Sequence, residues 1–356
     1  MTNVRIERIR QKLAAEGMDA LLVKQPANVR YLSGFTAGDD ASLLITASDA
    51  FIITDFRYYE QAQRESPAYQ LVKLEKPLPA TFADLVHQLG ARRVAFEGDF
   101  VTYALYQELS SAEGINLVPT KGWIETLRAI KSSEELALIQ RAVAISDAAI
   151  AALPELIRPG MTERQLALEL EIHMRTHGAE AISFPIIAAG GPNGAMPHAV
   201  ATDRPLMPGE PIVLDLGARV AGYGSDLTRT ICLGQPDARF QEIYGLVLAA
   251  QEAAESAIRP GILGKEVDAI ARQIIMDAGY GDAFGHGLGH GIGLWHDPPT
   301  LNPRSEDRLQ PGMVFSVEPG IYLPGWGGVR IEDVVVVTDT GAKVLTAVSK
   351  SPVLPR

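Results

Sequence analysis

Cysteine is almost absent from this 356-residue chain, which contains only Cys232. One thiol forms neither an intramolecular disulfide nor a thiolate-rich zinc site, so zinc-finger classes are excluded and a reducing compartment is indicated. No apolar run approaches the roughly 20 residues that a membrane-spanning helix requires. The first ten residues are charged and contain no hydrophobic signal segment. We therefore expect a cytoplasmic protein that does not bind membranes.

Positive charge is also scarce: the chain has 32 lysines and arginines but 43 acidic residues, which gives a formal net charge of -11. Neither sign is concentrated in a block of consecutive residues. Binding a phosphate backbone would have to work against this negative field, so we expect no nucleic-acid partner. With 47% hydrophobic and 21% charged residues, the composition is that of a folded protein, and the length predicts two domains.

The first third of the chain alternates helical and strand-like patterns, which predicts a small α/β domain over residues 1–125. A charged helix is expected at 4–16, and short apolar runs predict strands at 20–23, 42–46, 51–54, 70–74, 94–97 and 115–118. From Ser132 a new helix opens with a glutamate-rich first turn and continues to Ala149. We place the domain boundary just before it, so that the second domain spans residues 126–356.

The second domain contains an internal repeat. The segments Ile-Arg-Pro-Gly that begin at Ile157 and Ile258 lie 258 − 157 = 101 residues apart. Each copy ends one helix and starts an amphipathic one, and each then leads into two apolar strands joined by a glycine-rich turn. The expected helices span 163–176 and 265–278, and the expected strands 211–216, 226–233, 314–322 and 328–337. This duplication predicts a pseudo-twofold α+β domain with a site between its two halves.

Four acidic residues interrupt these apolar strands: Asp215, Asp226, Glu318 and Glu332. In a hairpin centred on the glycine-rich turn, the first two carboxylates would face each other about 5 Å apart. A buried, ionised carboxylate costs several kcal/mol unless it is paired or coordinated. One buried acid of this kind usually pairs with a base, here Arg219, Arg229 or Arg330. Four acids at corresponding places in both halves instead favour two divalent cations.

Two histidines lie in a segment, 285–293, in which every second residue is glycine. An extended segment places His286 and His290 on one face about 13 Å apart, so we expect one to bind an ion and the other to contact substrate. The glycines match no phosphate-binding loop. His173 and His177 have a metal-ligand spacing, but they end a helix and no glutamate lies between them. We interpret them as structural.

The motifs around these residues resemble, in order and spacing, the dinuclear pita-bread metallopeptidases. The matching segments are Val-Leu-Asp215-Leu-Gly, Ser-Asp226-Leu-Thr-Arg-Thr, Gly-His290-Gly-Ile-Gly, Val-Glu318-Pro-Gly-Ile-Tyr and Val-Arg-Ile-Glu332-Asp. The segment Asn28 to Thr36, the linker Leu127 to Ser132 and Pro197-His198-Ala are similar to the proline-directed branch, prolidase and aminopeptidase P. The resemblance covers nearly the whole chain. It implies a creatinase-like α/β N-terminal domain followed by an α+β pita-bread (creatinase/aminopeptidase) catalytic domain.

The resemblance also implies a ligand set for two divalent metal ions per subunit. Asp215 would bind one ion, His290 and Glu318 the other, and Asp226 and Glu332 both. Oxygen ligands with one imidazole and no thiolate favour Mn, while Co, Zn and Fe remain possible. Two ions about 3.5–4 Å apart hold a bridging hydroxide and polarise a carbonyl. Glu318 would act as the general base.

Further roles follow from the same resemblance. His198 would stabilise the tetrahedral intermediate or transfer a proton, His286 would line the proline subsite, and His296 would contact the substrate. Tyr322 and Arg330 would lie at the substrate site and orient the two glutamates. His296 stands six residues after His290, where relatives generally have seven. In an extended segment such a one-residue shift turns a side chain to the opposite face.

The function implied is that of an exopeptidase, an Xaa-Pro aminopeptidase or an Xaa-Pro dipeptidase, which hydrolyses the bond between an N-terminal residue and proline. Peptides with proline in second position would be its substrates, and the chain would form a homodimer. Two alternatives share the fold: a creatinase-like hydrolase, which dispenses with the metals, and a non-enzymatic peptide-binding module, which typically lacks ligands. The complete ligand set in this sequence argues against both. It decides neither between aminopeptidase and dipeptidase nor between metals.

Overall fold

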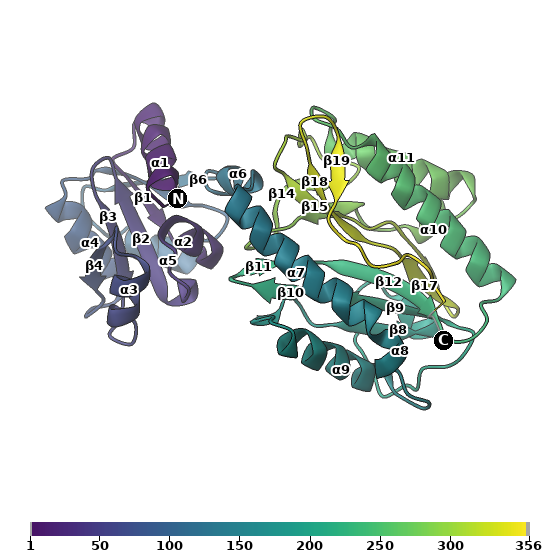
Figure 1. Ribbon diagram of the computed structural model, residues 1–356. Helices are drawn as coiled ribbons and strands as arrows, with labels where there is room; N and C mark the ends of the chain where they lie inside the picture. Colours follow the sequence, from purple (N-terminus) through teal and green to yellow (C-terminus); the bar gives the residue numbers. More distant parts are fainter. Residues whose placement is uncertain (1, 354–356) are drawn as a thin grey trace. The chain divides into compact units, whose positions relative to one another are not determined.

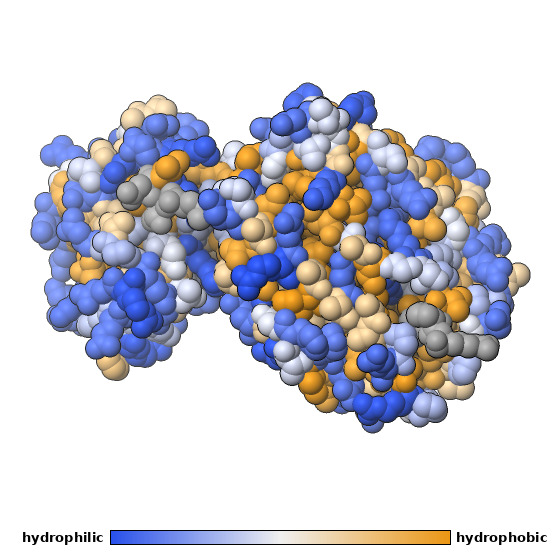
Figure 2. Space-filling view, in the orientation of Figure 1, coloured by the Kyte–Doolittle hydropathy of each residue, from blue (hydrophilic) through white to orange (hydrophobic). Residues whose placement is uncertain are grey.

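The computed structural model describes residues 2–353 and divides into two units, Met1–Arg128 and Ala129–Arg356 (Figure 1). Hydrophilic and hydrophobic residues are mixed on the visible face of both units (Figure 2). Both units contain hydrophobic cores, and in the second unit one large cluster gathers mainly residues of the first repeat and another mainly residues of the second. No helix among the described residues is both long enough and apolar enough to cross a membrane.

The N-terminal unit is built on a six-stranded sheet in the order β4-β3-β2-β1-β5-β6. Its strands are β1 (Ala20–Val23), β2 (Ala41–Thr46), β3 (Ala50–Thr54), β4 (Gln70–Lys73), β5 (Arg93–Glu97) and β6 (Asn116–Thr120). β2 runs antiparallel to both of its neighbours, and the other pairs are parallel. Short apolar runs thus identified all six strands to within two residues, because the inner strands of a sheet covered on both faces are apolar throughout.

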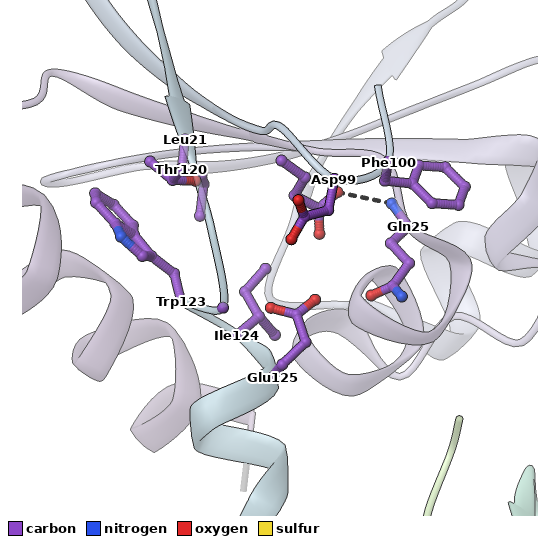
Figure 3. A pocket seen from close by; sticks show the side chains of 10 residues that line it. Leu21, Gln25, Asp99, Phe100, Thr120, Trp123, Ile124 and Glu125 are labelled. Carbon is purple, nitrogen blue, oxygen red and sulfur yellow. Dashed lines mark hydrogen bonds between the residues drawn. The ribbon is translucent and has the colours of Figure 1, made fainter. Parts of the chain in front are cut away.

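The helices of this unit are α1 (Thr2–Glu16), α2 (Pro26–Ser33), α3 (Tyr59–Glu65), α4 (Leu78–Gln88) and α5 (Tyr103–Leu109), with α6 (Glu125–Ala129) at its end. Asn28 is buried and donates its amide hydrogens to Glu97 and Glu125, while its oxygen accepts from Arg128. Glu97 and Glu125 also line a small cavity of about 60 Å³ together with Trp123 (Figure 3). Asn28 therefore connects α2 to β5 and α6.

The helices of the second unit lie on either side of its strands (Figure 1). They are α7 (Ser133–Ala151), α8 (Leu153–Leu156), α9 (Glu163–Thr176), α10 (Ala238–Ala257) and α11 (Gly264–Asp277). α7 begins with a capping box in which Ser132 and Glu135 satisfy each other's backbone N–H groups. α9 and α11 are the two amphipathic helices of the repeat.

The strands of the first repeat are β7 (Ala181–Ile182), β8 (Ile187–Gly190), β9 (Pro211–Leu216), β10 (Ala218–Val220), β11 (Tyr223–Gly224) and β12 (Leu227–Cys232). Those of the second are β13 (Gly289–Gly291), β14 (Asp297–Leu301), β15 (Val314–Val317), β16 (Gly320–Leu323), β17 (Gly327–Arg330), β18 (Asp333–Val337) and β19 (Ala342–Val344). Hydrogen bonds from Thr230 to Arg330 and from Glu332 to Thr228 join the two repeats.

The register of the first hairpin differs from our expectation. Asp215 stands opposite Thr228, so Asp226 is its diagonal neighbour on the same face instead of its direct partner. The tight turn is formed by Ala221 and Gly222, both with positive φ, and this two-residue turn sets the register of the ladder that follows. In the second hairpin, the pairs Val317↔Asp333 and Gly320↔Arg330 belong to one continuous register. This register places Glu318 directly opposite Glu332.

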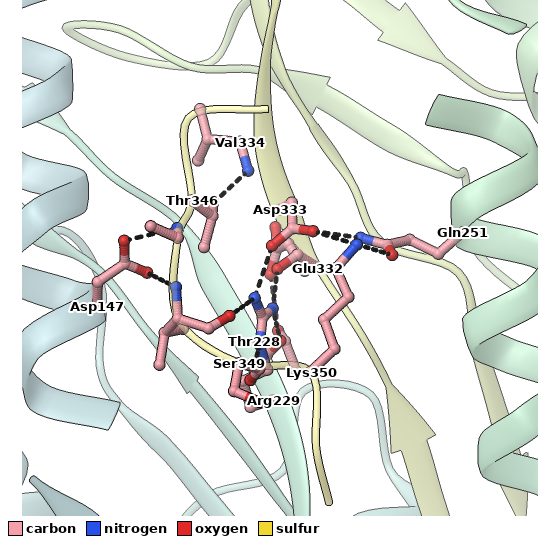
Figure 4. A network of polar contacts seen from close by, with 12 residues as sticks. Asp147, Thr228, Arg229, Gln251, Glu332, Asp333, Val334, Thr346, Ser349 and Lys350 are labelled. Carbon is pink, nitrogen blue, oxygen red and sulfur yellow. Dashed lines mark hydrogen bonds and ion pairs between the residues drawn. The ribbon is translucent and has the colours of Figure 1, made fainter. Parts of the chain in front are cut away.

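A buried polar network holds residues 346–350 against β12 and β18 (Figure 4). Arg229 pairs with Asp333 at 2.7 Å and donates to the backbone oxygens of Val348 and Ser349. Lys350 pairs with the same carboxylate at 2.7 Å. Arg229 is therefore fully engaged with Asp333 and the C-terminal segment, and it does not neutralise any of the four candidate metal-binding acids.

Candidate metal centre

A cavity of about 850 Å³ opens in the second unit and is lined by both repeats. The candidate residues among its walls are Asp215, Asp226, Glu318, His198, His286, His290, His296 and Arg330. The polar residues lie among apolar ones such as Phe184, Ile292 and Leu294. Concave sites of this kind, largely apolar with a few convergent polar groups, are typical of small-ligand sites.

Five of the candidate residues meet at one place. Asp215, Asp226 and Glu332 each bring a carboxylate oxygen within 4.8 Å of the other two. The Nε2 atom of His290 lies 3.4 Å from Asp226 Oδ2 and 3.5 Å from Glu318 Oε1. Asp215 lies on β9 and Asp226 directly precedes β12, and the second repeat supplies the other three.

The described residues balance the charges of this cluster only in part. Burial and the neighbouring carboxylates raise the pKa values of Asp226 and Glu332 well above their usual range, and burial raises the pKa of Glu318 to about 7. Asp215 Oδ1 and Glu332 Oε1 are buried and have no hydrogen-bond partner among the described residues. Uncompensated buried oxygens with one imidazole fit divalent cations of the Mn, Co, Zn or Fe type.

Arg330 provides part of the missing positive charge. Its side chain is 4% exposed, and Nη2 pairs with Asp215 Oδ2. Nη1 donates to the hydroxyl of Tyr322 at 2.8 Å and to the backbone oxygen of Pro197 at 3.1 Å. The expected alternative, in which an arginine neutralises one of the acids, therefore holds for Asp215.

A hydrogen-bonded chain continues from Arg330 through Tyr322 to His286. His286 Nε2 lies 3.0 Å from the Tyr322 hydroxyl, and Nδ1 lies 2.8 Å from the carbonyl oxygen of Gly287. Burial lowers the pKa of His286 to about 4, so the ring is neutral at neutral pH. Because a carbonyl oxygen only accepts, Nδ1 carries the hydrogen and Nε2 accepts from Tyr322. Burial also raises the pKa of Tyr322 to about 12, which keeps the hydroxyl protonated.

The two other candidate histidines lie at the cavity wall. His198 is exposed in the loop that follows β8, and His296 Nδ1 lies 3.4 Å from His290 Nδ1. The shortened step from His290 to His296 does not turn His296 away from the site. The register of β13 against β14 shifts between His290 and Gly291, so the segment that leads to His296 does not follow regular strand alternation.

Two residues that support the cluster were not identified from the sequence. The Thr228 hydroxyl donates to Glu332 at 2.7 Å and accepts from Arg330 Nε at 3.0 Å. The Ser316 hydroxyl donates to Glu318 at 3.0 Å and accepts from the His290 N–H at 3.1 Å. Each stands two residues from an acid on the same strand face, and strand alternation was the signal that could have found them.

The histidine pair that we interpreted as structural stands apart from this cluster. His173 is in the last turn of α9 and His177 is its C-cap, with ring centroids 3.9 Å apart. His177 Nδ1 lies 2.7 Å from the His173 carbonyl oxygen. Among the described residues, no acid or cysteine joins them in a metal-binding group.

Comparisons with known proteins identify a family for both parts of the chain. Residues 137–339 match metallopeptidase family M24, and residues 5–130 match the creatinase/prolidase N-terminal domain. The chain is 41% identical to the uncharacterized peptidase YqhT of Bacillus subtilis over 96% of this chain and 98% of that protein. It is 37% identical to the Xaa-Pro dipeptidase of Pyrococcus furiosus over 96% of this chain and 97% of that protein.

Solved structures extend the likeness to the whole fold. The Xaa-Pro dipeptidase from Bacillus anthracis is 41% identical and superposes with a TM-score of 0.95 over 99% of both chains. The X-Pro aminopeptidase from Thermotoga maritima is 36% identical, with a TM-score of 0.91 over 97% of this chain and 98% of that one. The fold expected from the resemblance is confirmed. The chain belongs to metallopeptidase family M24 and carries the creatinase/prolidase N-terminal domain.

Proposed function

We propose that this metallopeptidase is an exopeptidase that hydrolyses the bond between an N-terminal residue and proline. The observation that carries the proposal is the meeting of five side chains that could bind metal, four of them on the wall of the 850 Å³ cavity, with two buried carboxylate oxygens unpartnered among the described residues. Relatives named Xaa-Pro dipeptidase and X-Pro aminopeptidase support the preference for proline. Apolar walls at Phe184 and Ile292 suit a proline ring.

In this proposal two divalent ions would be held by Asp215, Asp226, His290, Glu318 and Glu332. When bound, the two ions supply a Lewis acid for the scissile carbonyl and lower the pKa of a water molecule. Manganese is the metal we expect, because the donors are mainly carboxylate oxygens.

The side chains of this chain supply the remaining steps. Glu318 takes the proton of the attacking water at its carboxylate, which Ser316 holds by a 3.0 Å hydrogen bond. Arg330 and Thr228 orient Asp215 and Glu332. His198 and His296, both at the cavity wall, donate to the substrate carbonyl or to the leaving nitrogen. Neutral His286 lines the proline subsite. We also expect the chain to act as a homodimer.

Two other functions share this fold. A creatinase-like hydrolase works without the metals, and a peptide-binding module has no need of a complete ligand set. All five side chains are present and adjacent in this structure, which favours the metal-dependent peptidase over both.

The test is hydrolysis by protein that has been stripped of metal with a chelator and resupplied with Mn²⁺. We expect Ala-Pro or Ala-Pro-Ala to be cleaved only after resupply, and Ala-Ala, the matched control without proline, to be cleaved much more slowly. Cleavage of the dipeptide alone identifies a dipeptidase, and cleavage of the tripeptide identifies an aminopeptidase. Absence of cleavage with two equivalents of metal bound would refute the proposal and favour the binding module.

A further inference from the structure

Glu163 is a buried carboxylate that the proposed mechanism does not use. It is the first residue of α9, and its exposed fraction is 0%. Its Oε1 atom accepts a hydrogen bond from the backbone N–H of Gly190 at 2.8 Å. Its Oε2 atom accepts from the Asn193 amide at 2.7 Å, and from the backbone N–H and the hydroxyl of Thr202 at 2.9 and 2.6 Å. Charge-assisted hydrogen bonds of this kind stabilise a carboxylate that burial has removed from water.

The donors come from near the two ends of one segment, residues 190–202, which contributes to the cavity wall. The segment contains His198, which lines the cavity and is itself exposed. From the cavity side, Arg330 Nη1 donates to the backbone oxygen of Pro197 at 3.1 Å. Glu163 therefore ties the ends of the segment together, and Arg330 holds its middle next to His198.

The second repeat shows that a helix begins at this position without an acid. The repeat spacing of 101 residues aligns Glu163 with 163 + 101 = 264, and Gly264 is the first residue of α11. A side chain at Gly264 would collide with the backbone oxygen of Thr300, because β14 packs directly against the start of that helix. In the first repeat the same position carries a carboxylate that reaches the segment 190–202. We therefore attribute Glu163 to the segment that it holds and not to the helix that it begins.

We propose that Glu163 is a positioning residue, which fixes the segment 190–202 so that His198 meets the substrate at the cavity wall. This inference rests on the proposed function, in which His198 donates to the substrate, and adds to it the residue that places this donor. An exposed side chain on a loop keeps its place only if the backbone that carries it is fixed. A displacement of about 1 Å at a catalytic group costs about 100-fold in rate.

The substitution E163Q tests this role with little change in volume. Glutamine has only one acceptor oxygen, so at least one of the four hydrogen bonds is lost together with the charge. On Ala-Pro or Ala-Pro-Ala with Mn²⁺-loaded protein, we expect kcat to fall about 10-fold or more and KM to change less than about threefold, because His198 acts on the reacting atoms. In the H198A background, E163Q should change kcat less than about twofold, because the histidine that it positions is already gone.

The matched control is E171Q, the same substitution on the same helix, at a partly exposed glutamate that pairs with Arg175 at 2.8 Å. We expect E171Q to leave kcat unchanged in both backgrounds. N193A removes one donor from the side of the segment and should lower kcat only where His198 is present. It carries the test if melting curves show that E163Q is not folded. Equal losses with and without His198, an unchanged kcat, or a loss of bound Mn²⁺ in the folded variant would overturn the inference.

Hydrogen–deuterium exchange separates this inference from the proposed function. If the wild type cleaves neither peptide, the proposed function has failed, and exchange then tests Glu163 by itself. Peptides from 190–202 should exchange faster in E163Q than in the wild type or E171Q, whereas peptides from 211–232 should not change. Unchanged exchange of the segment 190–202 in E163Q contradicts the inference.

Discussion

Among single residues, Asp226 lies close to three other candidate ligands of the cluster. Its carboxylate lies within 3.4 Å of His290 Nε2 and within 4.8 Å of oxygens from Asp215 and Glu332. We predict that Asp226→Asn abolishes hydrolysis and weakens Mn²⁺ binding at least about 100-fold, because an uncharged amide replaces a carboxylate that the proposal assigns to the metal centre. Metal content after dialysis and steady-state kinetics measure the two effects.

Asp203→Asn serves as the matched control, because it makes the same change at an exposed acid that pairs with Arg164 on the surface. We expect it to leave both metal content and rate unchanged. Near-wild-type hydrolysis by Asp226→Asn, with metal reduced but still bound, would show that Asp226 does not have the assigned role.

At the level of elements, the C-terminal segment is held to α10 and β18 by titratable groups. Lys350 lies 2.7 Å from Asp333 on β18 (Figure 4). It also lies 3.3 Å from Glu255 on α10, to which Gln251 donates at 3.0 Å. Burial and the nearby Asp333 carboxylate raise the pKa of Glu255 to about 7. The folded state thus holds a proton on Glu255 that the unfolded chain releases near pH 4.5.

This pKa gives a prediction with a definite sign. A raised pKa in the folded state contributes stability that is complete below pH 4.5 and is lost as the pH rises through 7. Glu255→Gln keeps a neutral side chain at every pH. Relative to wild type, the variant should therefore gain about 1–3 kcal/mol in the free energy of unfolding between pH 5.5 and pH 8.5. Urea denaturation at the two pH values measures this gain.

Glu252→Gln makes the same substitution at an exposed site one turn earlier on α10 and should show no such difference. If the stability of Glu255→Gln relative to wild type is the same at both pH values, Glu255 does not titrate as described.

For the whole molecule, the division into two units predicts which unit bound metal stabilises. All five candidate ligands belong to the second unit, so ions that bind the folded state stabilise that unit by about 2.7 kcal/mol at a concentration of 100 Kd. Hydrogen–deuterium exchange in the presence of Mn²⁺ and in the presence of chelator measures this stabilisation separately for each segment of the chain. Peptides from 211–232 and 314–337 should exchange more slowly with the metal, and peptides from 20–120 should not change. Equal protection of both units would contradict a centre confined to the second.

The sequence by itself determined the elements and the chemistry of the site. Apolar runs and helical periodicity are local signals, so they located β1 to β6 and the repeat helices α9 and α11 almost to the residue. Acids that interrupt apolar strands are costly unless something compensates them, and this cost alone marked Asp215, Asp226, Glu318 and Glu332 as candidates.

Tertiary structure decided which of these groups meet, and with what partners. The turn at Ala221 and Gly222 set the register that places Asp215 opposite Thr228. Arg330 pairs with Asp215 across 115 residues, and Arg229 with Asp333 across 104. Such pairings depend on how the two repeats pack, and no periodicity within a short segment carries that information. The same packing places Arg219 on the cavity wall with no ion-pair partner among residues 2–353, which no property of its neighbours in the sequence predicts.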